Sequence, residues 1–386
     1  MPSVASHLNV VLMTNFLPPY RISVLTELRN RFPRLSILIS ARTDPAGAWP
    51  PNWGELPVRL QRSLSLKSHW RHPHGFCDPM SIQIPLDTLP RLITLRPNVI
   101  IAGEMGARTV QAAIYRRLVG RARLVIWATV SEVTEDGRGL LRNWLRRLLL
   151  KSADAVIVNG ESGARYIRRF GVDADAVFRA PQTTAIEQFS STTQRPGAIR
   201  RRLLYTGRLA GQKGLQPFLL ELAGWCRQNP TKNVEFWLVG DGHLSDVLAS
   251  CPLPGNLRTR FLGHIPYERL PEIYREGGIF VFPTLADEWG LAVVEAMAAG
   301  LPVLGSVHSQ AVEELVTDGY NGWVFRSDET ESTRQAIHRA MCAGTDELDM
   351  MSRRAAERAR DLTPTLMVER ITKAIIYAAA KRSERS

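Results

Sequence analysis

The sequence predicts an α/β protein made of two doubly wound domains, each with a parallel sheet. Its 386 residues are two to three times the common domain size. Short apolar, β-branched runs alternate with longer amphipathic stretches, and this alternation occurs on both sides of a polar, proline-containing segment. A hydrophobic content of 45% supplies sizeable cores, which excludes a disordered chain or a small disulfide scaffold.

The first half supplies the strands of one Rossmann-like domain, which we predict over residues 1–180. Near-continuous apolar strands separated by helices are typical of a parallel sheet that is covered on both faces. Five such runs each stand beside a helical pattern, at residues 10–13, 35–39, 99–101, 124–127 and 155–158.

The second half repeats the pattern, so residues 200–364 are predicted to form a second Rossmann-like domain. Its apolar runs lie at residues 203–205, 234–239, 280–282 and 302–304. Residues 181–199, rich in Gln, Ser, Thr and Pro, are the predicted linker. Residues 365–386 are predicted to be a C-terminal helix and tail, with the helical pattern running from Thr365 to Lys381.

The excess of positive over negative charge lies entirely in the first half. Residues 1–195 hold 26 Lys and Arg against 14 Asp and Glu, whereas residues 196–386 hold 23 of each. A field of this sign attracts phosphates, whether of a nucleic acid, an anionic leaflet or a phosphorylated substrate.

Cysteines and apolar runs indicate the compartment. The four cysteines form no C-x-x-C pair and suggest neither a zinc site nor a disulfide framework. The first residues lack the pattern of a secretory signal, and no apolar run reaches the roughly 20 residues of a membrane span. We expect a cytoplasmic protein, or one that is peripheral on the inner face of the cell membrane.

The most informative segment is residues 283–303. A strand ends at Phe282, a loop carries Asp287 and Glu288, and Gly290 and Leu291 open a helix that contains Glu295. A helix N-terminus presents N–H groups and a positive dipole end, which suit an anion. Carboxylates beside an anion are natural acceptors for the hydroxyls of a sugar or a ribose.

Upstream of this segment, predicted strands are followed directly by glycines. Gly207 and Arg208 follow the strand at 203–205, and Lys213 lies in the same loop; together the two cations suit a diphosphate. Gly240 and His264 follow the next two strands, at the sheet edge where open α/β sheets bind ligands. His264 is either a contact for a nucleotide base or an ordinary, partly exposed histidine.

These motifs resemble glycosyltransferase family 4, whose pattern is Glu-x7-Glu followed by Ala-Met-Ala-x-Gly-x-Pro-Val, and which also has a Gly-Arg-Leu…Lys-Gly element. The resemblance covers residues 202–326. It implies the GT-B fold, in which two Rossmann-like domains flank a cleft and the C-terminal helix crosses back. It also implies transfer from a nucleotide sugar with retention at the anomeric carbon.

The resemblance assigns roles in the donor site. Arg208 and Lys213 are expected to hold the diphosphate and Glu295 the ribose, while Asp287 contacts the donor sugar. The sequence departs from the family by one methylene, because Asp287 stands eight residues before Glu295 where the pattern has Glu. Either Asp287 fills this position or Glu288 reaches it after a small adjustment of the loop, and we favour Asp287.

The acceptor side matches the family more loosely. Tyr20 and Arg21 are expected to face the cleft or, alternatively, only to begin a helix. Many relatives place a histidine near residues 126–133, where this chain has none, so Ser131 or Glu132 is expected to cover part of its role.

The helix from Leu140 to Lys151 has an apolar stripe of Leu141, Trp144, Leu145 and Leu148. The remaining arc carries Arg142, Arg146, Arg147 and Lys151. Such a helix either lies on an anionic membrane surface or faces the core while its charges reach into solvent. The charge of the first half favours the membrane.

The sequence therefore predicts a metal-independent hexosyltransferase of bacterial surface-polysaccharide synthesis. Its substrates are a nucleotide diphosphate sugar and a saccharide or lipid-linked acceptor, and no cofactor, metal or nucleic acid is expected. The alternatives are a sugar-nucleotide epimerase of the same fold, a nucleic-acid-binding protein motivated by the charge, and an inactive scaffold.

Overall fold

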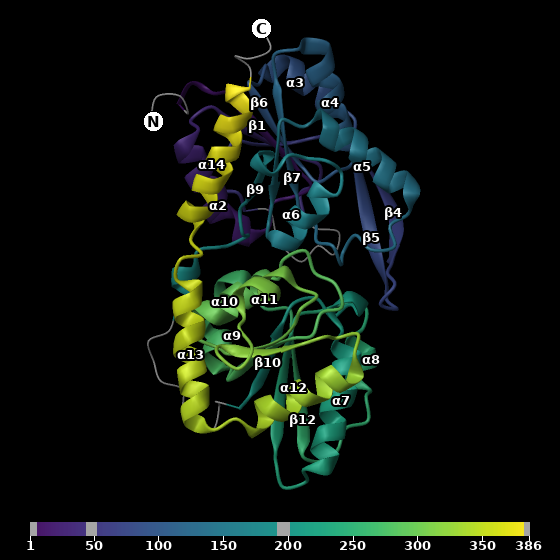
Figure 1. Ribbon diagram of the computed structural model, residues 1–386, viewed down its shortest axis with the longest axis vertical. Helices are drawn as coiled ribbons and strands as arrows, with labels where there is room; N and C mark the ends of the chain where they lie inside the picture. The colour runs from purple at the N-terminus through teal and green to yellow at the C-terminus, as the bar shows by residue number, and fades with distance from the viewer. Residues whose placement is uncertain (1–5, 44–51, 191–200, 382–386) are drawn as a thin grey trace. The chain divides into compact units, whose positions relative to one another are not determined.

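The computed structural model describes residues 6–43, 52–190 and 201–381, and the chain forms two compact units (Figure 1). The first unit comprises Met1–Trp70, Pro79–Thr184 and Thr363–Ser386, and the second comprises Arg71–Asp78 and Ala185–Leu362. The chain thus returns to the first unit at its end. Of the predicted linker 181–199, residues 185–190 belong to the second unit, where Ile186 and Phe189 are buried in the core, and residues 191–199 lie outside the described residues.

The first unit contains a seven-stranded sheet in which every neighbouring pair is parallel. Its order is β3-β2-β1-β6-β7-β8-β9. The strands are β1 (Val10–Thr14), β2 (Leu35–Ile39), β3 (Val58–Leu60), β6 (Val99–Gly103), β7 (Arg123–Ala128), β8 (Ala155–Val158) and β9 (Val177–Arg179). All five runs predicted in this half are confirmed as strands.

Helices cover both faces of this sheet, which explains its near-continuous apolar strands. Alternate residues of β1 enter two separate cores: Val10 and Leu12 pack with α2 and α14, and Val11 and Met13 pack on the opposite side. The helices are α2 (Ile22–Arg31), α3 (Thr88–Leu95), α4 (Ala107–Val119), α5 (Leu140–Ser152), α6 (Glu161–Arg168) and α14 (Pro364–Ala380), with 3-10 turns η1 (Pro19–Arg21) and η2 (Ala174–Ala176).

A two-stranded hairpin, β4 (Ser63–Arg71) and β5 (Cys77–Pro85), was not predicted. Leu64, Leu66 and Ile82 are exposed on it, so its sequence alternates without a buried apolar face that would mark it. Its tip, Arg71–Asp78, belongs to the second unit.

The second unit contains a six-stranded parallel sheet in the order β12-β11-β10-β13-β14-β15. The strands are β10 (Leu203–Thr206), β11 (Val234–Val239), β12 (Leu257–Gly263), β13 (Ile279–Phe282), β14 (Val303–Ser306) and β15 (Gly322–Phe325). The helices are α7 (Leu215–Gln228), α8 (Ser245–Ala249), α9 (Leu270–Glu276), α10 (Leu291–Ala298), α11 (Gln310–Leu315), α12 (Thr330–Cys342) and α13 (Thr345–Ala359), with 3-10 turns η3 (Ile186–Gln188), η4 (Gly211–Lys213) and η5 (Tyr267–Arg269).

Both sheets reverse their strand order at one point, between β1 and β6 in the first unit and between β10 and β13 in the second. Loops that leave the carboxyl ends of the two flanking strands diverge there, and ligands of open α/β sheets bind in the resulting crevice. The predicted donor residues Arg208 and Asp287 follow β10 and β13, so the fold brings them to the reversal point of the second sheet.

We predict that Gly214→Ala destabilises the second unit by about 1–2 kcal/mol or more, as measured by chemical denaturation. Gly214 has a φ of +62°, and an added Cβ would lie 2.2 Å from the carbonyl oxygen of Pro283. Gly224→Ala is the matched control because nothing lies within 4 Å of its added Cβ inside helix α7, so it is expected to stabilise by about 0.5–1 kcal/mol. Equal effects of the two changes would contradict this reading of the turn.

Candidate functional site

Three glycine-ended strands of the second unit form the floor of the predicted donor site. The N–H of Gly207 donates to the carbonyl of Val239 (3.0 Å), and the N–H of Gly240 donates to the carbonyl of Gly263 (2.8 Å). A Cβ on Gly240 would lie 2.1 Å from the carbonyl oxygen of Gly207, so only glycine fits there. His264, directly after β12, is exposed at this same edge of the sheet.

Arg208 presents an exposed guanidinium just after β10. The buried Tyr205 hydroxyl donates to the carbonyl of Arg208 (2.8 Å) and thereby fixes the backbone from which the side chain projects. Among the residues that the structure describes, none forms a hydrogen bond or ion pair with this guanidinium. Arg208 is therefore available to an anionic ligand.

Lys213 is held in place by contacts between two loops. Its turn, η4, packs on the loop after β13, where the carbonyl of Gln212 accepts from the N–H of Leu285 (2.8 Å) and the hydroxyl of Thr284 (2.9 Å). The side chain of Lys213 is mostly buried, and its Nζ forms an ion pair with Oδ2 of Asp287. Two residues that the sequence singled out separately thus meet in the structure.

The same contacts distinguish the two acids of the loop. Asp287 is 6% exposed, and its Oδ1 accepts from the N–H of Trp289 (3.1 Å). Glu288 is less buried, and the side-chain amide of Gln310 donates to its carbonyl. Burial and the negative charge of Asp287 raise the pKa of Glu288. Asp287 is therefore the acid that meets Lys213, although its contact with a donor sugar remains a prediction.

The start of helix α10 depends on Gly290. Its φ is +101°, and an added Cβ would lie 2.6 Å from the hydroxyl oxygen of Ser309 and 2.9 Å from the ring of Phe282. Glycine at this position lets α10 begin at Leu291 immediately behind the acidic loop. The helix N-terminus therefore lies where the sequence predicts an anion.

Glu295 is buried in α10, and two tyrosines hold its carboxylate. The hydroxyl of Tyr267 donates to Oε1 and that of Tyr274 to Oε2, both at 2.9 Å. Burial raises the pKa of Glu295 to about 7, while the two hydroxyl hydrogen bonds act in the opposite direction. Sequence reasoning found Glu295 but not its tyrosine partners, and contact with a ribose remains a prediction.

Sequence reasoning missed Asp78, at the tip of the β4–β5 hairpin. Its carboxylate accepts from the N–H groups of Gly211 (2.9 Å) and Gln212 (2.7 Å), and Nε2 of His243 lies 3.3 Å away. Asp78 thereby fixes the turn that carries Lys213. The only signal in the sequence was the short cluster of titratable residues at 72–78, which no known pattern made informative.

In the first unit, Tyr20 and Arg21 form η1 after β1, at the reversal point of the sheet. The Arg21 guanidinium lies 5.4 Å from the ring centre of Trp127. A small cavity of about 20 Å³ is lined by Arg21, Trp127, Glu104 and the ends of β1 and β6. Glu104, which was not predicted, has a φ of +65°, a backbone strain that is common at functional positions.

Ser131 and Glu132 are both engaged in contacts within the first unit. Ser131 is buried and shares hydrogen bonds with Thr134. Glu132 forms ion pairs with Arg165 (2.7 Å) and Arg169. A role for either residue in replacing the absent histidine remains a prediction.

Helix α5 leaves most of the predicted stripe exposed, against the alternative in which the stripe faces the core, although Leu145 is partly buried and packs against that core. Leu140, Leu141, Trp144 and Leu148 are 88, 79, 59 and 46% exposed, and we call these four residues the apolar α5 surface. Arg146, predicted on the cationic arc, is buried instead and pairs with Glu135 and Tyr166. The prediction for Arg146 was wrong because it shares the core-facing side of α5 with Leu149 and Leu150.

Among the described residues, no helix is long and apolar enough to cross a bilayer.

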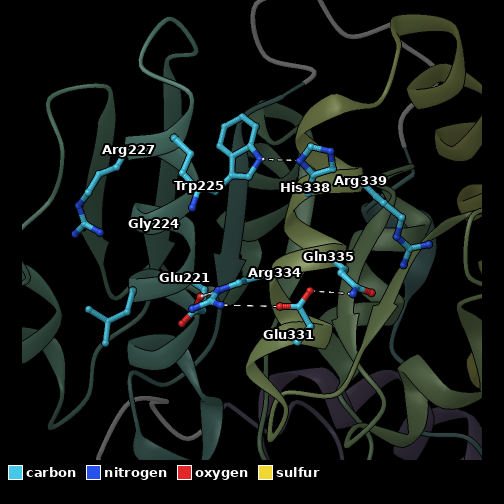
Figure 2. Close-up of a pocket in the computed structure, with 11 residues that line it drawn as sticks. Glu221, Gly224, Trp225, Arg227, Glu331, Arg334, Gln335, His338 and Arg339 are labelled. Carbon is cyan, nitrogen blue, oxygen red and sulfur yellow. Dashed lines mark hydrogen bonds and ion pairs between the residues drawn. The ribbon is translucent and has the colours of Figure 1, made fainter.

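A separate pocket lies in the second unit, between α7 and α12 (Figure 2). It encloses about 750 Å³, and Figure 2 shows Arg334 between Glu221 and Glu331, with Trp225 directed toward His338. None of the predicted site residues lines it, and its acids are paired with Arg334, which leaves little net charge for an anionic ligand.

We predict that the free energy of unfolding of the wild type falls relative to Glu295→Gln as the pH rises from about 4.5 to 7. A buried carboxyl whose pKa is raised to about 7 retains its proton in the folded state after the unfolded chain has lost it. The stabilisation is full below about pH 4.5 and is lost through pH 7, with a total of about 3 kcal/mol. Denaturant titrations of both proteins across this range measure the difference, and a constant difference would contradict the prediction.

The match to a known protein family lies within the second unit. Residues 200–342 match the family model described as glycosyl transferases group 1. A curated relative, the D-inositol 3-phosphate glycosyltransferase of Nocardia farcinica, is 26% identical over 231 residues, which cover 55% of this chain and 50% of the relative. The chain spans about half the length of the first curated relatives it matches.

Solved structures share the fold of the whole chain. HepE from Anabaena, crystallised with UDP and glucose, has a TM-score of 0.70 and 16% identity, covering 96% of this chain and 100% of that one. The lipopolysaccharide outer core galactosyltransferase WaaB has a TM-score of 0.66 and 13% identity, covering 95% and 99%. The predicted GT-B fold is thereby confirmed, and the match of residues 200–342 to the glycosyl transferases group 1 model agrees with the resemblance to family 4.

Proposed function

We propose that the protein transfers a hexose from a nucleotide diphosphate sugar to a hydroxyl group of a saccharide or lipid-linked acceptor, with retention at the anomeric carbon. One observation carries this proposal above the others. Arg208, Lys213 and Asp287 converge at the reversal point of the sheet in the very region that matches the glycosyltransferase family.

Arg208 and the glycine-ended strands suit the diphosphate. A guanidinium provides several donors in a rigid fork that matches phosphate oxygens. Because Gly207 and Gly240 lack side chains, a ligand can approach the backbone at the strand ends closely. The start of α10 adds the positive end of a helix dipole. These groups stabilise the charge that develops on the departing diphosphate.

The Lys213–Asp287 pair prepares the site before the donor arrives. Two mostly buried, opposite charges hold each other in a fixed position, so neither has to reorganise when the substrate binds. Lys213 then shares its donors between Asp287 and the diphosphate, while Asp287 accepts from a hydroxyl of the sugar. Glu295, less accessible than Asp287, is assigned to the ribose.

The reaction exchanges one bond for another at the anomeric carbon. The bond from this carbon to the diphosphate oxygen breaks, and a bond to the acceptor oxygen forms on the same face of the sugar. The acceptor proton passes to an oxygen of the departing diphosphate, as the family resemblance implies. The nucleoside diphosphate leaves with both electrons of the broken bond, so no protein base is required.

The diphosphate is proposed to bind through the cationic side chains and without a metal. An Asp-x-Asp sequence is present at Asp173-Ala174-Asp175, but it forms the turn η2 of the first unit, where both acids are exposed. Neither acid belongs to a group of three metal-ligating side chains among the described residues.

The apolar α5 surface supports an acceptor at a membrane and, with it, a role in bacterial surface-polysaccharide synthesis. Four large apolar side chains exposed on one helix are costly in water. Arg147 and Lys151 are exposed on the same helix, and the first half of the sequence carries all of the net positive charge. An interfacial helix of this kind binds anionic lipid both by burying its apolar side chains and through its positive charge.

We predict that one of the UDP-, GDP- and ADP-sugars raises the melting temperature by several degrees at a concentration of about 100 Kd. Arg208→Ala should weaken binding of that donor at least about tenfold, because a charge-assisted hydrogen bond to the diphosphate is lost. Isothermal titration with the purified chain measures both, with and without Mg²⁺, which should change the affinity less than twofold.

The matched control for this experiment is Arg227→Ala, which removes an exposed arginine of the same unit in the α7–α12 pocket. Its donor affinity should equal that of the wild type. Asp287→Asn should bind the nucleoside diphosphate yet lose turnover of the sugar donor. Binding of duplex DNA but of no nucleotide sugar, or equal losses in both arginine variants, would overturn the proposed function.

We further predict that the wild type sediments with phosphatidylglycerol vesicles and that Leu141→Gln/Trp144→Gln does so at least about tenfold less. Each of these side chains contributes about 1.5–3 kcal/mol when it leaves water. Leu220→Gln is the control, because Leu220 is 47% exposed on α7 of the second unit. Equal sedimentation of all three proteins, or loss with Leu220→Gln alone, would contradict membrane binding through α5.

A further inference from the structure

The second unit contains a cluster of metal-ligating side chains that the donor site does not use. His74 lies at the tip of the β4–β5 hairpin, His308 follows β14, and Asp328 follows β15. One ligand atom from each lies within 4.8 Å of the other two. The side chains of His74 and Asp328 are 19 and 24% exposed and that of His308 is 5% exposed, so the cluster is shielded but reachable.

The hydrogen bond of His74 fixes which ring nitrogen faces the cluster. Its Nδ1 lies 2.8 Å from the carbonyl oxygen of Leu285, which can only accept, so Nδ1 carries the proton. In the neutral ring Nε2 then holds a lone pair, and it lies 3.9 Å from Oδ2 of Asp328. The backbone N–H of His74 donates to Nδ1 of His72, which supports the tip of the hairpin.

A chain of hydroxyl groups fixes His308 in the same way. The hydroxyl of Ser327 donates to the carbonyl of Thr284 (2.7 Å) and accepts from the hydroxyl of Ser306 (3.0 Å). Its remaining lone pair therefore accepts from Nδ1 of His308 at 3.0 Å. Nε2 of His308 is left with a lone pair, 3.4 Å from Oδ1 of Asp328.

Two imidazole lone pairs and a carboxylate thus converge, and a cation between them would remove their mutual repulsion. Metal-ligating histidines usually donate their second N–H to a backbone carbonyl or another fixed acceptor, which is the arrangement seen at both rings. Ligand distances of about 2.0–2.2 Å require the three groups to close in by about 1 Å. Arg326 occupies Oδ2 of Asp328 (2.9 Å) and leaves Oδ1 for an ion.

We propose that His74, His308 and Asp328 form a binding site for a divalent transition-metal ion of the Zn²⁺ class. Imidazole nitrogen and carboxylate oxygen are ligands that such ions prefer, and three protein ligands leave one position for water. The site stands on its own residues and does not depend on the proposed transferase activity.

The position of the site suggests what the ion does. His74 holds the carbonyl of Leu285, and the carbonyl of His308 accepts from the N–H of Asp287 (3.0 Å). The two histidines therefore each form a hydrogen bond with the acidic loop, one on either side of Ala286. A bound ion joins these two contacts and fixes the loop, so its part is to position Asp287 rather than to touch the diphosphate.

The test is a titration of the full chain, first treated with chelator and dialysed, with Co²⁺ and Zn²⁺. We expect one equivalent of Co²⁺ to give the visible absorption of a low-coordinate site and to be displaced by Zn²⁺. His74→Ala and Asp328→Asn should each weaken binding at least about tenfold. Both residues are partly exposed, so their loss leaves the core intact, which circular dichroism checks.

His338→Ala is the matched control. His338 lies in the α7–α12 pocket, 3.9 Å from the sulfur of Cys342, and so offers a histidine–cysteine pair outside the proposed site. Unchanged binding in this variant supports the proposal. Absence of stoichiometric binding, its loss only with His338→Ala, or equal affinity in His74→Ala, Asp328→Asn and the wild type would each overturn it. No outcome depends on nucleotide binding or turnover.

Discussion

The candidate donor site depends on the contact between two loops, and the Lys213–Asp287 ion pair lies at its centre. The turn with Lys213 follows β10 and the loop with Asp287 follows β13, so 74 residues separate two groups that the reversal of strand order brings together. Backbone hydrogen bonds from the second loop to Gln212 and the close fit of Gly214 under Pro283 hold the loops in register. Loss of this contact would release Lys213 and Asp287 from each other.

The sequence predicted those features that short-range chemistry determines. Buried parallel strands are apolar throughout, so nine strand positions could be read directly, and the glycines and acids of the donor site follow them at fixed distances. It could not predict the hairpin, whose exposed alternation resembles a loop, or the tip residues His74 and Asp78, whose partners lie more than 130 residues away. The burial of Arg146 also escaped it, because a helical pattern shows spacing but not which face the core takes.

The two units divide the chemistry between them. The second contains the Lys213–Asp287 ion pair and every predicted donor residue, and its residues hold slightly more Asp and Glu than Lys and Arg. The first carries the positive charge, the apolar α5 surface and the strained Glu104 near Arg21. Such a division suits a protein in which one half recognises a soluble nucleotide while the other meets an acceptor at an anionic surface.

We expect the nucleoside diphosphate to bind where the loops after β10 and β13 meet. Hydrogen–deuterium exchange of the full chain, with and without saturating nucleoside diphosphate, tests it most directly, because exchange reports on each segment separately. We expect strong protection of residues 206–214 and 285–293 and unchanged exchange of α7 and α12. Protection confined to α7 and α12, around the pocket between these helices, would contradict it.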